Sequence, residues 1–344
     1  MTKQLVGNCL TTAMGIMPHK SIEQALDLAL SLDIPFWPQL PRYSYYEDMY
    51  VQASERFPGI VIDLEAKKIS FNMDKFMEEL PEYIEHSDDE SYFELSSQYS
   101  AVLDEFLKKD LSGYQLIRGQ NIGPLSFGLK IVDETDRPII YNDEVRPLLF
   151  EFFAQRINTQ YAQLKAKNSN AFVWIDEPGL EMLFSSMTGY TSETAKKDFI
   201  EFSQKIKGPW GVHLCGNPDW SFLLTGIEMN VLSVNIFNWG HIFTRYYSEV
   251  KDFLDRGGII SWGIVPTLTE EFSEETVNSI IEKLESHWNH LEQRGIDKQF
   301  ILSRSWLAPA KCCLVNLDGG ATVEESFKLL KEVSSILRAR YNLA

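Results

Sequence analysis

The chain has 344 residues, 44% of them hydrophobic, and a formal net charge of −17. An acidic chain repels the phosphate backbone of nucleic acids, and no cluster of Lys and Arg offsets this repulsion, so we expect no nucleic-acid partner. No run of about 18 apolar residues occurs, which argues against a membrane span, and the N-terminal segment lacks a signal-peptide cleavage site. Its four cysteines are too few for a disulfide scaffold. We therefore predict a reduced, cytoplasmic protein.

Helical and strand-like patterns alternate along the chain. Apolar residues recur at helical spacing over 21–33, 143–167, 191–206, 276–295 and 323–341. Short apolar runs that end in polar residues, Gly or Pro predict strands over 114–119, 171–178, 210–217, 231–238, 257–266 and 300–308. Because these strands and helices alternate without a hairpin signal, we expect a parallel sheet.

A (β/α)8 TIM barrel is the predicted fold, with an insertion of about 70–100 residues in the first half. The chain is expected to form a single domain over residues 1–344. A doubly wound sheet is the alternative, but no G-x-G-x-x-G follows the first strand and no P-loop occurs. Active sites of such barrels lie at the C-terminal ends of the strands, so chemically active residues are expected there.

One predicted strand ends in GVHLCGN, which places His213 and Cys215 two residues apart. Alternate residues of a strand point to the same side, so these two side chains are expected to converge. Zinc takes about four ligands and favours imidazole and thiolate. Cys312 or Cys313, after the last strand, would supply a third ligand, and only one of them is expected to bind, because adjacent residues diverge. The alternative is that His213 and Cys215 are ordinary buried residues.

The segment IDEP (175–178) places Asp176 and Glu177 at the end of another predicted strand. They are expected to face opposite ways, one toward the mouth of the barrel and the other toward backbone groups or a neighbouring arginine. An acidic pair that caps a helix would have the same spacing, so the spacing leaves both interpretations open.

Together these segments resemble cobalamin-independent methionine synthase. TTAMGIMPH is similar to the T-T-x-I-G-S-F-P-Q segment that opens the catalytic barrel of that family, IDEPGLE to its I-D-E-P-A-L, HLC to its zinc-binding H-x-C, and WLAPAKCCL to its W-V-N-P-D-C-G-L. HLCGN and WGIVPT also resemble the related uroporphyrinogen-decarboxylase-type methyltransferases, which move methyl groups from corrinoid proteins to thiols. Both resemblances imply a TIM barrel in which zinc binds the acceptor thiol.

The resemblance to methionine synthase implies zinc on His213, Cys215 and Cys312, while Cys313 falls where the family has glycine. Asn235 stands at the position of the family's glutamate ligand. A neutral amide is a poor zinc ligand, so the fourth position is left to water, another side chain or substrate.

The same resemblance assigns residues to the acceptor. Asp176 matches the aspartate that holds the ammonium group of the amino-acid substrate. Gly15 and Ile16 match the segment that cradles its carboxylate, although Ile16 replaces a serine of the family. Asn235, if it does not bind zinc, is expected near the substrate.

The predicted function is therefore zinc-dependent transfer of a methyl group to a thiol such as homocysteine. A methylcorrinoid or methyltetrahydrofolate would be the donor, and the expected partners are a small-molecule thiol and, for the corrinoid donor, a corrinoid protein. Two alternatives remain: a uroporphyrinogen-decarboxylase-like enzyme that acts on a tetrapyrrole, and a non-catalytic barrel that binds a thiol or docks a corrinoid protein.

Overall fold

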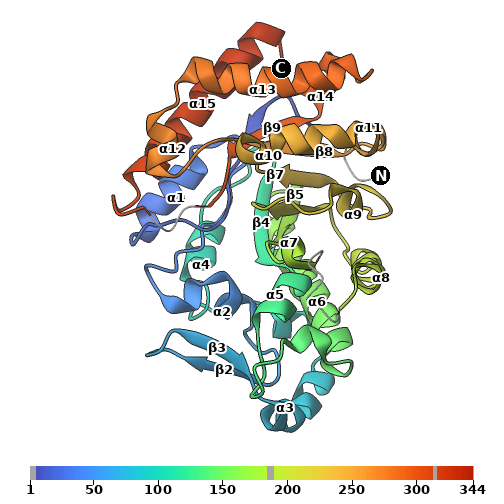
Figure 1. The fold of residues 1–344 in the computed structure, drawn as a ribbon. Helices are drawn as coiled ribbons and strands as arrows, with labels where there is room; N and C mark the ends of the chain where they lie inside the picture. The colour runs from blue at the N-terminus through green and yellow to red at the C-terminus, as the bar shows by residue number, and fades with distance from the viewer. Residues whose placement is uncertain (1–4, 184–189, 313–315, 344) are drawn as a thin grey trace.

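The computed structural model describes residues 5–183, 190–312 and 316–343 (Figure 1). Its strands are β1 (Leu10–Thr11), β2 (Ile60–Asp63), β3 (Lys68–Phe71), β4 (Ile117–Ile122), β5 (Ala171–Asp176), β6 (Trp210–Leu214), β7 (Val231–Val234), β8 (Ile259–Val265) and β9 (Ser305–Pro309).

The helices of the described residues follow in chain order. They are α1 (Ile22–Leu30), α2 (Met49–Ala53), α3 (Met73–Glu85), α4 (Ala101–Leu107), α5 (Pro124–Lys130), α6 (Val145–Lys167), α7 (Leu180–Leu183), α8 (Ser192–Ser203), α9 (Trp220–Leu224), α10 (Ile236–Phe243), α11 (Tyr247–Asp255), α12 (Thr269–Ser273), α13 (Val277–Gln293), α14 (Lys298–Ser303) and α15 (Ala321–Tyr341). Short 3-10 turns cover Tyr45–Glu47, Glu90–Phe93, Ile139–Tyr141 and Thr244–Tyr246.

The main sheet of the described residues has seven strands in the order β1-β9-β8-β7-β6-β5-β4, and every neighbouring pair is parallel. The sheet is curled, and helices pack around its outer side, among them α6 on β5, α10 on β8 and α15 on β9 (Figure 1). The predicted α/β class with a parallel sheet is confirmed. The strands are buried at every position except in the hairpin β2–β3, as expected for a parallel sheet covered on both faces.

The predicted eight-stranded barrel is not confirmed. Residues 34–39 pass between the edge strands β1 and β4, but they form single contacts rather than a strand: the Ile34 amide donates to the Thr11 carbonyl and the Arg118 amide to the Pro35 carbonyl, both at 3.0 Å. Prolines 35 and 38 lack the N–H that a continuous ladder requires, which explains why this segment stays irregular.

Two local predictions are wrong. The run 300–308 is not one strand, because its first residues belong to α14, whose N-terminus is capped by Asp297 through a 2.9 Å bond from the Phe300 amide. The expected absence of hairpins also fails, since β2 and β3 pair antiparallel around an exposed turn. This hairpin, α2, α3 and α4 lie in the part of the chain predicted as an insertion, and Figure 1 places the hairpin and α3 at the opposite end of the molecule from α13 and α15.

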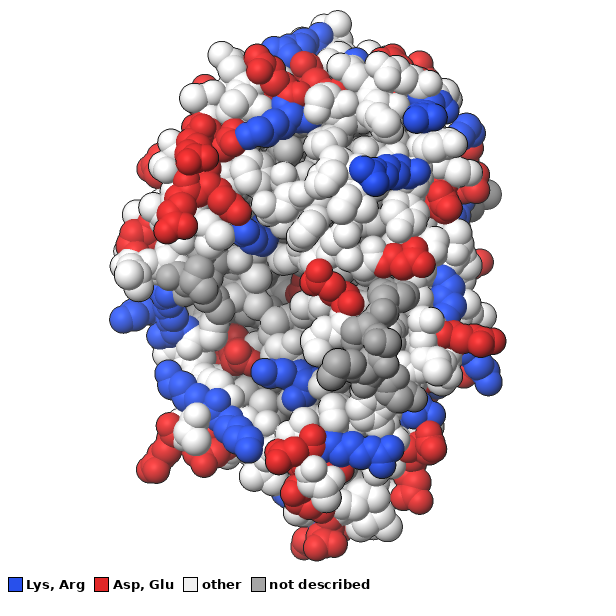
Figure 2. All heavy atoms as spheres, viewed as in Figure 1, with Lys and Arg blue, Asp and Glu red and all other residues white. Residues whose placement is uncertain are grey.

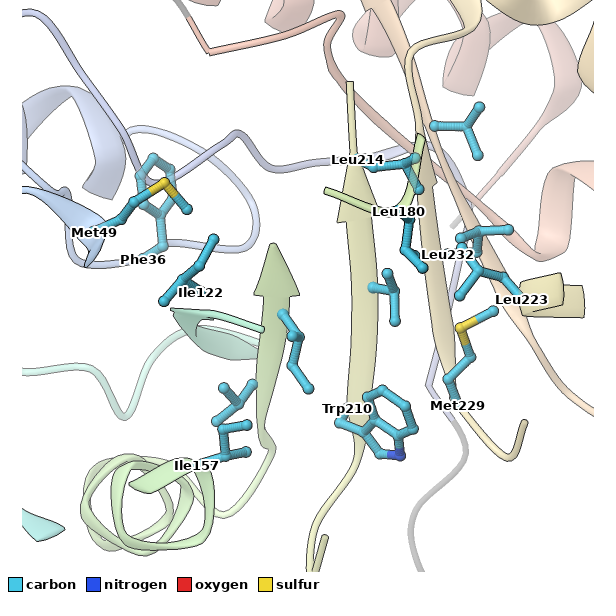
Figure 3. Close-up of a cluster of buried hydrophobic side chains, with 14 of the residues drawn as sticks. Phe36, Met49, Ile122, Ile157, Leu180, Trp210, Leu214, Leu223, Met229 and Leu232 are labelled. Carbon is cyan, nitrogen blue, oxygen red and sulfur yellow. The ribbon is translucent and has the colours of Figure 1, made fainter. Parts of the chain in front are cut away.

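The core has two parts that lie on the two faces of the sheet. The larger part lies between the sheet and the helices and includes Trp210, Leu214 and Leu232, with Leu223 and Met229 beside them (Figure 3). The smaller part collects large side chains from the other face: Leu10, Ile34, Leu116, Phe172, Trp174, Val231, Ile259 and Trp306. Because side chains alternate along a strand, Asp176 follows Phe172 and Trp174 on this second, concave face.

The face of the molecule seen in Figure 2 carries acidic and basic side chains in mixture. Among the residues that the structure describes, no helix is both long and apolar enough to cross a membrane.

Candidate active site

A single pocket at the C-terminal ends of the strands contains nearly all of the predicted site residues. It encloses about 340 Å³, its open mouth included, and is lined by Met14, Gly15, Ile16, Met49, Asp176, Pro178, His213, Leu214, Cys215 and Cys312. Six residues that the sequence assigned to metal or substrate, from four distant segments of the chain, therefore meet in one place. Asn235 is the predicted residue that does not line the pocket.

His213 and Cys215 converge at the end of β6, as the alternation of side chains predicts. The His213 Nε2 atom lies 3.1 Å from the Cys215 Sγ atom. On the other side of the ring, Nδ1 lies 3.0 Å from the hydroxyl of Ser233. Ser233 lies on β7, directly beside His213 in the register of the two strands. Burial lowers the pKa of His213 to about 4. The ring is therefore neutral near pH 7, which leaves one nitrogen with a lone pair that can bind a metal.

Cys215 and Cys312 form a hydrogen-bonded pair of free thiols. A hydrogen bond from Cys312 lowers the pKa of Cys215, and the positive charge of Lys311 acts in the same direction. The pKa of Cys312 is raised by the same bond and by burial. Cys215 is therefore the more acidic thiol of the pair, and thiolate is the form that binds metals and attacks electrophiles. Cys313 lies outside the described residues.

The contacts among the three proposed zinc ligands are pairwise. In residues 5–183, 190–312 and 316–343, no three His, Cys, Asp or Glu side chains are grouped closely enough to hold a metal ion. Cys215 belongs to both pairs, with His213 and with Cys312. The donor types, a neutral imidazole and two thiols, are those that zinc prefers.

Asp176 and Glu177 face opposite ways, as expected. Asp176 lines the pocket, where it is 7% exposed and accepts a 3.1 Å hydrogen bond from the Trp174 indole. Burial raises its pKa, while the charges of His213 and Arg118 act against this rise. Glu177 instead accepts bonds from two backbone amides in the first turn of α5, the closer at 2.8 Å. Its carboxylate therefore holds the strand end to α5, and Asp176 is left for the pocket.

Asn235 contacts the backbone of a pocket residue without lining the pocket itself. Its side chain caps α10 by accepting from the Asn238 amide, and its Nδ2 group donates to the Cys215 carbonyl at 3.2 Å. The Trp239 indole donates to the same carbonyl, also at 3.2 Å. Asn235 thus fixes the backbone of Cys215, and its predicted contact with substrate stays a prediction.

Three residues near the pocket were missed by reasoning from the sequence: Arg118, Trp174 and Ser233. The role of Ser233 depends on strand register, which no local pattern reveals, whereas Trp174 lies two residues before Asp176 and so on the same face of β5. Arg118 did leave a signal, because a charged residue inside the buried run YQLIRG is costly unless its hydrogen bonds are satisfied.

Comparisons with known proteins extend the description of the fold. The sequence matches no family model and no curated protein. The structure is similar to that of a methyltransferase from Methanosarcina mazei, with a TM-score of 0.54 and 15% sequence identity over 98% of this chain and 95% of that chain. At this identity the similarity concerns the fold, which the two chains share over nearly their whole lengths.

Proposed function

We propose that the protein is a methyltransferase that transfers a methyl group to a thiol held by zinc at His213, Cys215 and Cys312. The observation that carries the proposal is the run of contacts from the His213 imidazole through Cys215 to Cys312, in a pocket that also holds the carboxylate of Asp176. The similarity in fold to a methyltransferase supports the class of reaction.

The donor atoms of His213, Cys215 and Cys312, one imidazole nitrogen and two sulfurs, are of the kinds that zinc prefers. Zinc, when bound, would lower the pKa of an acceptor thiol, which is about 8.5 when free, so that the thiol binds as thiolate. His213 is kept neutral by burial and offers Nε2 on the side of Cys215. The hydrogen bond from Cys312 lowers the pKa of Cys215, which favours its metal-binding thiolate form. Cys312 follows β9 outside any helix or strand, so its side chain can adjust more readily than the two ligands at the end of β6.

The remaining pocket residues would hold the acceptor. Asp176 would accept hydrogen bonds from its amino group, and the backbone at Gly15 and Ile16 would hold its carboxylate. Met14 and Met49 supply an apolar wall that excludes water. In the transfer step the sulfur of the acceptor attacks the methyl carbon in line, the new S–C bond forms as the bond to the donor breaks, and the electron pair of that bond stays with the donor.

The donor is proposed to be a methylcorrinoid or methyltetrahydrofolate, and a corrinoid-carrying protein is the partner that the first of these would require. A decarboxylase that acts on a tetrapyrrole has less support. Its substrate carries several carboxylates, whereas the described lining of this pocket contains no Lys or Arg.

Metal analysis coupled to a methyl-transfer assay tests the proposal. The purified protein should hold one zinc ion per chain and methylate homocysteine from methylcobalamin or methyltetrahydrofolate. His213→Ala and Cys215→Ala should lose both zinc and activity. Cys9→Ala is the matched control, because Cys9 is buried at the start of the chain and does not line the pocket. Full zinc content and unchanged transfer in both ligand variants would overturn the proposal.

A further inference from the structure

Arg118 is a fully buried cation next to the pocket. It belongs to β4, has no exposed surface, and its guanidinium lies between the rings of Phe36 and Trp174, with the Cζ atom 4.6 and 4.3 Å from the two ring centres. A charge without contact to water is expensive to bury, so its partners indicate what it does.

The hydrogen bonds of Arg118 go to uncharged groups. Its Nε atom donates to the Thr12 hydroxyl at 3.1 Å, Nη1 donates to the Gln120 side-chain oxygen at 3.0 Å, and Nη2 donates to the Ala13 carbonyl. Burial lowers the pKa of Arg118 to about 9, and the charge that acts against this is the carboxylate of Asp176. The buried cation is therefore balanced by the acidic group that lines the pocket.

Trp174 joins these two charges. One face of its ring lies against the Arg118 guanidinium, and its indole N–H donates to the Asp176 carboxylate at 3.1 Å. The ring cannot turn without losing either the stacking or the hydrogen bond. Arg118 therefore helps to hold its orientation, and with it that of Asp176, together with the His213 ring, whose centre lies 5.3 Å from that of Trp174.

Gln120 joins Arg118 to the part of the pocket wall that Gly15 forms. Its side chain is held by Arg118 and by a bond to the Trp37 carbonyl, and it packs directly beneath Gly15. A Cβ atom at Gly15 would lie 2.5 Å from the Gln120 Cδ atom, so the backbone at Gly15 rests on this side chain. Arg118 thus supports both walls that would hold the acceptor, although it does not line the pocket itself.

We propose that Arg118 is a positioning residue for the acceptor, acting on Asp176 through Trp174 and on the backbone at Gly15 through Gln120. This inference rests on the proposed function, because it assigns Asp176 to the amino group of an acceptor thiol. If Arg118 had only a structural role, replacing it would lower the stability of the fold and would weaken the binding of all ligands equally. A positioning residue should affect the group that Asp176 recognises and leave the metal site intact.

Trp174→Phe tests the link with little change of shape, because phenylalanine still stacks on Arg118 but cannot donate to Asp176. Phe36→Leu is the matched control, since it removes the other stacking ring, which has no bond to Asp176. The two probes are homocysteine and 4-mercaptobutyrate, which lacks its amino group. Binding to the zinc-loaded protein is measured by calorimetry, with KM and kcat, zinc content and melting temperature alongside.

Trp174→Phe should weaken homocysteine binding about tenfold and raise KM similarly, with a smaller change in kcat, because it removes a hydrogen bond to a charged group. Binding of 4-mercaptobutyrate and zinc content should stay at wild-type values, and Phe36→Leu should change binding of neither thiol by more than about twofold. Arg118→Lys, which keeps the charge, should bind homocysteine better than Arg118→Met.

Two results would overturn the inference alone: wild-type homocysteine binding in Trp174→Phe, or an equal loss for both thiols. If the wild-type protein holds zinc but binds neither thiol, or if it holds no zinc, the proposed function fails and the inference fails with it.

Discussion

Ser233 offers a way to perturb the proposed zinc ligand His213 without removing it. The Ser233 hydroxyl is fully buried and lies 3.0 Å from Nδ1 of His213, whose Nε2 faces Cys215. For Nε2 to bind metal, the proton must sit on Nδ1 and be donated to this hydroxyl. Ser233→Ala removes the acceptor, so the ring can turn or take the other tautomer. Loss of such a partner lowers metal affinity about 10–100-fold, or about 1.4–2.7 kcal/mol.

The affinity for zinc is measured by competition with a chromophoric chelator at pH 7.5. Ser261→Ala is the matched control: Ser261 pairs in register with Ser233 on the next strand and is equally buried, and its hydroxyl has no hydrogen-bond partner among the described residues. We expect this control to bind zinc as the wild type does. An unchanged affinity in Ser233→Ala, or the same loss in both variants, would refute the role given to His213.

Three further predictions follow from contacts around the site and in the insertion. Gly15→Ala should raise the KM for homocysteine and lower stability by about 1–3 kcal/mol, because the new methyl group meets the Gln120 side chain at 2.5 Å; kinetics and urea unfolding measure both effects. Ser126→Ala should cost about 2–3 kcal/mol in urea unfolding, since its buried hydroxyl donates to the Glu177 carboxylate at 2.5 Å, and a loss below about 0.5 kcal/mol would contradict this. Burial raises the pKa of Glu47 from 4.5 to about 7, so the folded protein keeps a proton that the unfolded chain releases. The stability contributed by Glu47 is therefore full below pH 4.5 and is lost as the pH rises to about 7, a difference of about 3 kcal/mol that Glu47→Gln should abolish in urea titrations across this range.

Much of the site could be predicted from short-range patterns. The two-residue spacing of His213 and Cys215 was enough to place their side chains together, because alternation along a strand is a local property. The same alternation separated Asp176 from Glu177. Their positions at strand ends, in a chain with alternating strands and helices, located the pocket as well.

What could not be predicted depended on long-range geometry. The side chain of Asn235 caps α10 and holds the Cys215 backbone, and neither contact follows from its place after a strand. Residues 34–39 form no strand of the described sheet, because Pro35 lies where a ladder would need an N–H group. Arg118 could be noticed but not interpreted, because its partners come from the segment after β1, from β5 and from residues 34–39, whose arrangement only the folded chain defines.

The pairing of β1 with β9 determines when the pocket can exist during synthesis of the chain. Leu10 pairs with Trp306, about 300 residues later, so the first strand leaves the ribosome long before its partner is made. At about 5–20 residues per second this delay is roughly 15–60 s. During that time Gly15 and Cys312, which both line the pocket, cannot come together. A chain interrupted anywhere before β9 therefore has no complete site, and partial products should show no trace of the activity.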